Sequence, residues 1–108
     1  MKIWMLMLAS GALALSAGQA QAGDPASGKE KSATCQACHG PDGNSPQAQF
    51  PRLAGQYEDY LLRTLRDYKS GDRQNPIMAP LVATLSEEDM KDLAAYFASQ
   101  TGLNAIEP

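Results

Sequence analysis

The pentapeptide Cys35-Gln36-Ala37-Cys38-His39 constrains this chain more than any other feature. It contains the only two cysteines and the only histidine among the 108 residues. Two thiols at this spacing can form thioether bonds to the two vinyl groups of one haem, and the adjoining imidazole can bind the iron. We therefore predict one covalently bound haem c on Cys35 and Cys38, with His39 as an axial iron ligand.

Three other interpretations of the two cysteines compete with haem attachment. They can form a disulfide in an oxidising compartment. They can also form a thioredoxin-like redox pair, although that interpretation expects a βαβ pattern, which the sequence lacks. A structural zinc site needs four ligands, and one C-x-x-C with one histidine supplies three.

The first 22 residues have the pattern of a secretory signal peptide. Lys2 precedes an apolar stretch at residues 3–15, and Ala20-Gln21-Ala22 has the small-x-small form of a cleavage site. An uncleaved membrane anchor is the alternative, but the apolar stretch is shorter than the roughly 20 residues that span a bilayer. We predict cleavage after residue 22, a mature domain over residues 23–108, and a periplasmic location.

The remaining chain is long enough for one small domain. Its net charge of −3 before cleavage argues against nucleic acid as a partner, because phosphate binding needs a basic surface. A chain this short buries a small apolar core and normally needs an additional source of stability. A macrocycle packed inside the fold would supply it.

No segment shows the sustained alternation typical of strands, so we predict an all-α fold. Three helices are expected, at residues 25–37, 56–70 and 86–100. Asp24 and Ser86 have the side chains of N-caps, and Gly71 is a C-terminal stop. The long loops between them, at residues 40–55 and 72–85, are unusual in a small domain unless they surround a ligand.

A second axial iron ligand is expected to be a methionine, because no further histidine or cysteine is available. Outside the signal segment there are two, Met78 and Met90. Met90 falls on the apolar face of the last predicted helix, where methionine usually packs in the core. Met78 lies in an irregular loop between Pro76 and Pro80, whose rings restrict the backbone. We therefore predict Met78 as the second ligand.

The order of these features resembles a small class I cytochrome c. The segments Phe50-Pro51-Arg52-Leu53-Ala54-Gly55-Gln56 and Asn75-Pro76-Ile77-Met78-Ala79-Pro80 are similar to those of haem domains from bacterial periplasmic cytochromes, which occur singly or as fused pairs. The resemblance covers nearly all of residues 23–100. It implies the cytochrome c fold, with three main helices and long loops wrapped around one haem. A single C-x-x-C-H means that this chain resembles one half of the fused di-haem proteins.

The resemblance also implies roles for individual residues. Met78 becomes the distal ligand. The carbonyl group of Pro51 either accepts the Nδ1 proton of His39 or belongs to an ordinary proline turn. Asn75 either starts a turn or donates to the Met78 sulfur. The first and last helices are expected to cross near Gly28 and either Tyr96 or Phe97.

The function implied is that of an electron carrier. One electron would pass between respiratory-chain or dehydrogenase donors and a terminal acceptor, through transient contacts with redox partner proteins. Such a protein is not an enzyme, has no membrane span after signal cleavage, and is expected to be a monomer. Two alternatives remain: a haem subunit of a larger oxidoreductase, and a gas-sensing or peroxidatic haem protein with a labile Met78.

Overall fold

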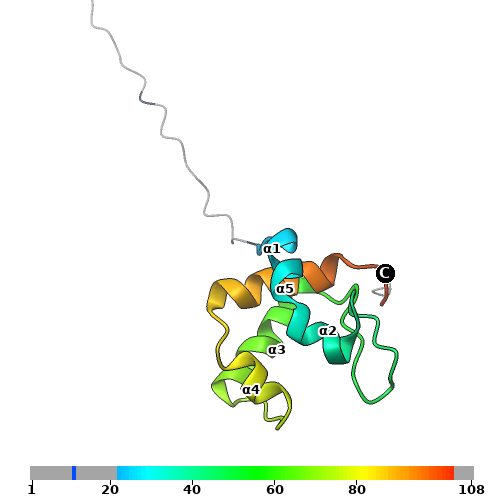
Figure 1. The fold of residues 1–108 in the computed structure, drawn as a ribbon. Helices are drawn as coiled ribbons and strands as arrows, with labels where there is room; N and C mark the ends of the chain where they lie inside the picture. Colours follow the sequence, from blue (N-terminus) through cyan, green and yellow to red (C-terminus); the bar gives the residue numbers. More distant parts are fainter. Residues whose placement is uncertain (1–10, 12–21, 104–108) are drawn as a thin grey trace, which may run out of the picture.

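The computed structural model describes residue 11 and residues 22–103, and within these residues the fold consists of helices and loops without a strand (Figure 1). In chain order the helices are α1 (Pro25–Lys31), α2 (Ala33–His39), α3 (Glu58–Ser70), α4 (Met78–Val82) and α5 (Glu87–Ser99). The predicted all-α class is confirmed. Apart from Gly11 and Ala22, the predicted signal peptide lies outside the described residues.

Helices α1 and α5 pack against each other at one end of the molecule, and α4 lies at the other end (Figure 1). Gly28 is buried at this crossing. A Cβ atom added there would lie 2.0 Å from the carbonyl oxygen of Asp92 and 2.8 Å from Cβ of Tyr96. The backbone of α1 therefore rests directly on α5, and the implied crossing of the first and last helices near Gly28 and Tyr96 is confirmed.

The apolar core is small and is built mainly by α5. Leu93, Ala94, Tyr96 and Phe97 form one buried cluster with Leu61 of α3. Met90 is also buried, with 3% of its surface exposed, so its predicted place in the core is confirmed. This cluster contains few large side chains, so the apolar core that the protein itself supplies is small.

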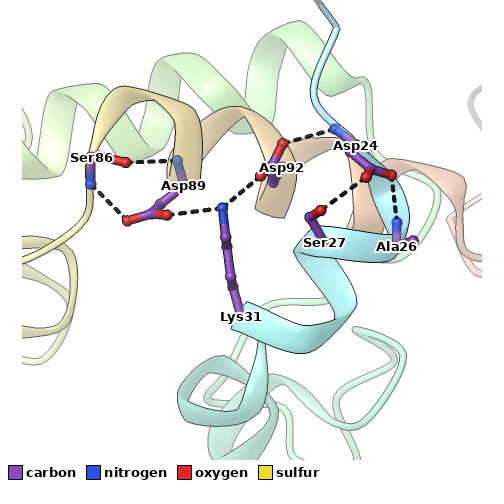
Figure 2. A network of polar contacts seen from close by, with 7 residues as sticks. All are labelled: Asp24, Ala26, Ser27, Lys31, Ser86, Asp89 and Asp92. Atoms are coloured by element: carbon purple, nitrogen blue, oxygen red, sulfur yellow. Dashed lines mark hydrogen bonds and ion pairs between the residues drawn. The ribbon is translucent and has the colours of Figure 1, made fainter.

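A polar network fastens both ends of α1 to α5 (Figure 2). The buried Asp92 carboxylate accepts hydrogen bonds from the backbone N–H of Asp24 at 2.8 Å and from Lys31 Nζ at 2.6 Å. Lys31 also pairs with Asp89 at 3.0 Å. Asp89 completes a capping box with Ser86, which confirms Ser86 as the N-cap of α5.

The predicted helix at residues 25–37 is wrong in one respect, because it is interrupted at Ser32. The Ser32 hydroxyl donates to the carbonyl of Lys29 at 2.6 Å, and the Ser32 backbone N–H bonds to the same carbonyl at 3.2 Å. A serine hydroxyl that bonds to a nearby backbone carbonyl competes with the regular hydrogen bonds of the helix. The chain therefore ends α1 and begins α2, although Asp24 caps α1 as predicted, accepting from the N–H of Ala26.

The second predicted loop, residues 72–85, is also partly wrong. Its middle forms the short helix α4, so Met78 is the first residue of a helix rather than part of an irregular loop. Val82, with 1% of its surface exposed, anchors the far end of α4 in the interior. The other boundaries differ by one or two residues, and Gly71 ends α3 in the left-handed conformation as predicted.

Within the part of the chain that the structure describes, none of the helices has the length and apolar character needed to cross a membrane.

Candidate functional site

Helix α2 presents both thiols of the C-x-x-C-H motif. Cys35 and Cys38 are half-buried free cysteines one helical turn apart, and residues at this spacing lie on the same face of a helix. Cys35 also packs against the buried cluster of α3 and α5. Gly40, with φ of 85°, ends α2 immediately after His39. His39 is therefore the last residue of the helix that carries the two thiols.

His39 is buried, and its ring is held in one orientation. Its Nδ1 lies 2.7 Å from the backbone carbonyl oxygen of Pro51. Because a carbonyl oxygen can only accept, Nδ1 carries the proton in this contact and Nε2 keeps its lone pair. This is the form in which a histidine binds a metal ion, with its other ring nitrogen fixed by a hydrogen bond.

The loop after α2 carries Pro51 to His39 because it closes on itself. The carbonyl of Gly43 accepts from the N–H groups of Leu53 at 2.8 Å and of Ala54 at 3.2 Å. Gly43 has φ of 85°, and a Cβ atom there would lie 2.8 Å from both the Ala54 nitrogen and Phe97 Cδ1. Only glycine fits this turn. The closure at Leu53 and Ala54 brings Pro51, two residues earlier in the loop, to the imidazole of His39.

Two further contacts hold this loop, and sequence reasoning missed both. The Tyr96 hydroxyl donates to the carbonyl of Pro41 at 2.7 Å. The buried Ser45 hydroxyl donates to the carbonyl of Gln47 at 2.8 Å and lies 3.4 Å from that of Cys38. The Tyr96 contact joins residues 55 positions apart in the chain, so no local sequence pattern predicts it.

The surroundings of the two cysteines bear on the redox-pair and zinc interpretations. Both thiols are free, and burial raises the pKa of the Cys35 thiol, which opposes the thiolate form that a reactive redox cysteine needs. Among residues 22–103, no three His, Cys, Asp or Glu side chains are grouped to hold a metal ion. The described residues thus offer no ligand set for structural zinc.

Met78 comes from a different part of the fold. The structure brings His39 and Pro51 together and sets Cys35 and Cys38 on the same helix, whereas the half-buried Met78 begins α4. No hydrogen bond of the described residues links Met78 to these four. Two free thiols, an imidazole with a free Nε2 and a thioether nevertheless form a donor set that suits haem c and its iron.

Comparison with known proteins finds cytochromes c that match nearly the whole described domain. The model of the family Cytochrome c matches residues 25–101. Cytochrome c4 of Pseudomonas aeruginosa is 56% identical over 79 residues, which are 73% of this chain and 39% of that protein. Cytochrome c-554(548) of Halomonas halodenitrificans is 43% identical over 82 residues, or 73% of this chain and 99% of that protein.

A solved structure shares the fold as well. Reduced recombinant cytochrome c4 from Pseudomonas stutzeri matches with a TM-score of 0.73 and 47% identity, over 76% of this chain and 48% of that chain. The chain thus spans about two fifths of the length of the Pseudomonas aeruginosa relative and nearly all of the Halomonas one.

Proposed function

This chain belongs to the cytochrome c family, and from that premise we propose that it is a periplasmic carrier of single electrons rather than an enzyme. The contact that carries the proposal is the one between His39 Nδ1 and the Pro51 carbonyl, at 2.7 Å. It fixes an imidazole next to two free thiols and leaves one ring nitrogen able to bind iron. The family's covalently bound haem c supplies the one-electron redox chemistry.

Cys35 and Cys38 tether the macrocycle. Their common helix face holds the two sulfur atoms toward the same side, and the packing of Cys35 against the core joins the attachment point to α3 and α5. The buried cluster is small, so we expect the haem to contribute much of the interior. The double variant Cys35→Ala with Cys38→Ala should therefore be unfolded or degraded after secretion. A stable, folded, haem-free double variant would contradict this role.

His39 and Met78 are the two axial ligands in this proposal. Pro51 orients the imidazole through the Nδ1 hydrogen bond. If both residues hold the iron, they would leave it no open coordination position for a substrate. A histidine and a methionine as ligands would favour the reduced form and raise the reduction potential. These residues suit the transfer of an electron to a partner protein without the making or breaking of bonds.

The ferric absorption spectrum of the haem-loaded protein tests the ligand pair. We expect a methionine-to-iron charge-transfer band in the wild type and its loss in Met78→Ala. Met90→Leu is the matched control, because Met90 is a methionine buried within α5. The control should keep the band. A high-spin wild-type spectrum would refute the assignment and favour the gas-sensing or peroxidatic alternative. A band that disappears in Met90→Leu instead would refute the assignment by making Met90 the ligand.

The periplasmic location rests on the sequence pattern of residues 1–22. The mass and N-terminal sequence of the protein from a periplasmic extract would test it. Cleavage after Ala22 should leave Gly23 as the first residue. A chain that keeps residues 1–22 and remains in the membrane fraction would instead indicate a retained anchor.

A second candidate function is that of a haem subunit or module within a larger oxidoreductase. The observation that favours it is the similarity to the structure of thiosulfate dehydrogenase (TsdBA) from Marichromatium purpuratum, with 34% identity and a TM-score of 0.68 over 76% of this chain and 21% of that chain. Gel filtration of the native protein distinguishes the two candidates. A free carrier elutes at the size of the single chain, whereas a subunit elutes together with its partners.

A further inference from the structure

We propose that Asn75 is a positioning residue that holds Met78 in place for iron binding. This inference rests on the proposed function, because it concerns the methionine assigned there as the distal ligand. The side-chain oxygen of Asn75 accepts hydrogen bonds from the backbone N–H of Ile77 at 2.9 Å and of Met78 itself at 3.0 Å. Its backbone carbonyl accepts from the N–H of Ala79 at 3.0 Å. One residue thus binds three consecutive amides around the methionine.

Helix α4 needs this support because it cannot hold itself together. It has five residues, and forming a first helical turn is unfavourable without contacts outside the helix. Its far end has such a contact in the buried Val82. At its near end Ile77 makes no side-chain capping bond and is 54% exposed. The Asn75 oxygen is therefore the polar anchor at the end where Met78 begins the helix.

The neighbouring residues cannot take over the positioning role of Asn75. Pro76 and Pro80 flank the three bonded amides, and neither has a backbone N–H to donate. No charged side chain occurs in the sequence from residue 74 to residue 86, so no ion pair of this segment can replace the bonds. If the Asn75 oxygen is removed, the N–H groups of Ile77 and Met78 lose the acceptor that sets the direction of the Met78 backbone.

The side-chain oxygen, rather than the amide nitrogen, makes both contacts. An aspartate at the same position keeps an equivalent oxygen and lacks the N–H₂ group. An alanine lacks both groups. The pair Asn75→Asp and Asn75→Ala therefore separates positioning through the oxygen from direct donation to the sulfur, the other role that the sequence allowed.

Competition by imidazole for the iron of the ferric, haem-loaded protein measures how firmly Met78 is held. Loss of a side-chain cap typically shifts such an equilibrium by about fivefold. We expect imidazole to bind Asn75→Ala about fivefold more tightly than the wild type, with a weaker methionine-to-iron band. Asn75→Asp should bind imidazole within about twofold of the wild type and keep the band.

Two controls make the result specific. Asp24→Ala removes a similar side-chain cap from α1, where Asp24 accepts from the N–H of Ala26 at 3.0 Å. It should lower the stability to urea without changing imidazole affinity. Met78→Ala lacks the competing methionine, so it should bind imidazole more tightly than any other variant and gives the upper limit of imidazole affinity.

Each outcome decides the proposal. Unchanged imidazole affinity in Asn75→Ala would overturn the positioning role, and so would an Asn75→Asp variant that behaves like Asn75→Ala. In both cases the ligand assignment stands if the wild type remains protected relative to Met78→Ala. A wild type that binds imidazole as tightly as Met78→Ala would overturn the ligand assignment together with this proposal.

Discussion

A methyl group on Gly28 would collide with the backbone of α5, and Gly28→Ala is the change that tests the helix crossing most directly. The added Cβ would lie 2.0 Å from the Asp92 carbonyl oxygen and 2.6 Å from its carbonyl carbon. Restoring an ordinary contact of about 3.5 Å requires the helices to move apart by about 1.5 Å. The same movement would break the 2.8 Å bond between the Asp24 N–H and the Asp92 carboxylate.

Two opposing effects set the expected change in the free energy of unfolding. Alanine is a better helix former than glycine by about 1 kcal/mol, which favours the variant. Overpacking in a rigid core usually costs about 1–3 kcal/mol, and the upper value applies because backbone atoms cannot turn away as a side chain can. The variant should therefore be less stable by about 2 kcal/mol, with a melting temperature lower by about 10 °C.

Urea unfolding of the haem-loaded wild type and variant, followed by far-UV circular dichroism, measures this difference. Gly71→Ala is the matched control, because the same methyl group meets nothing within 4 Å there. Its φ of 87° is unfavourable for alanine, so we expect a loss of about 1 kcal/mol from backbone conformation alone. A Gly28→Ala protein as stable as the wild type, or more stable, would show that α1 and α5 are not in direct backbone contact.

Other predictions follow from the polar contacts. Tyr96→Phe should lower the free energy of unfolding by about 1 kcal/mol through loss of its hydroxyl bond to the loop, and an unchanged urea midpoint would contradict this. Ser86→Ala should likewise lower it by about 1 kcal/mol by removing the cap of α5, with the loss appearing as reduced helicity at the same temperature. Lys31→Met should be destabilised at pH 7, because Lys31 holds the pKa of Asp92 below its usual range. A carboxylate with a lowered pKa stabilises the fold above about pH 4, and that stabilisation is lost as the pH falls through the folded-state pKa. The difference from the wild type should therefore disappear in strong acid, and a difference independent of pH would exclude the ion pair as its cause.

Local sequence signals were sufficient for most of the helices and for the chemistry of attachment. Asp24 and Ser86 mark helix starts because each side chain accepts from an N–H two or three residues later, and Gly71 marks a helix end because its N–H bonds to the Asp67 carbonyl four residues earlier. The C-x-x-C-H spacing predicts haem attachment for the same reason, since one helical turn sets the distance between the thiols. These features require no knowledge of what packs against them.

The break at Ser32 and the helix at residues 78–82 were predicted incorrectly. Ser32 is fully buried, and a serine in that environment satisfies its hydroxyl on a nearby backbone carbonyl, here that of Lys29. Helix α4 is too short for its pattern to be recognised, and it forms because Val82 reaches the interior and Asn75 bonds its first amides. Helix propensity alone predicts neither the burial of Ser32 nor the contacts that hold α4.

The sequence by itself thus determined the outer ends of the longer helical segments and which side chains can hold a haem, because those properties depend on atoms a few bonds apart. Only the tertiary structure decided that Pro51 meets His39, that Tyr96 reaches Pro41, and that Asp92 joins the start of α1 to α5. These contacts join residues between 12 and 68 positions apart. They exist because helix packing and loop closure bring distant segments together, and no local pattern records which segments will meet.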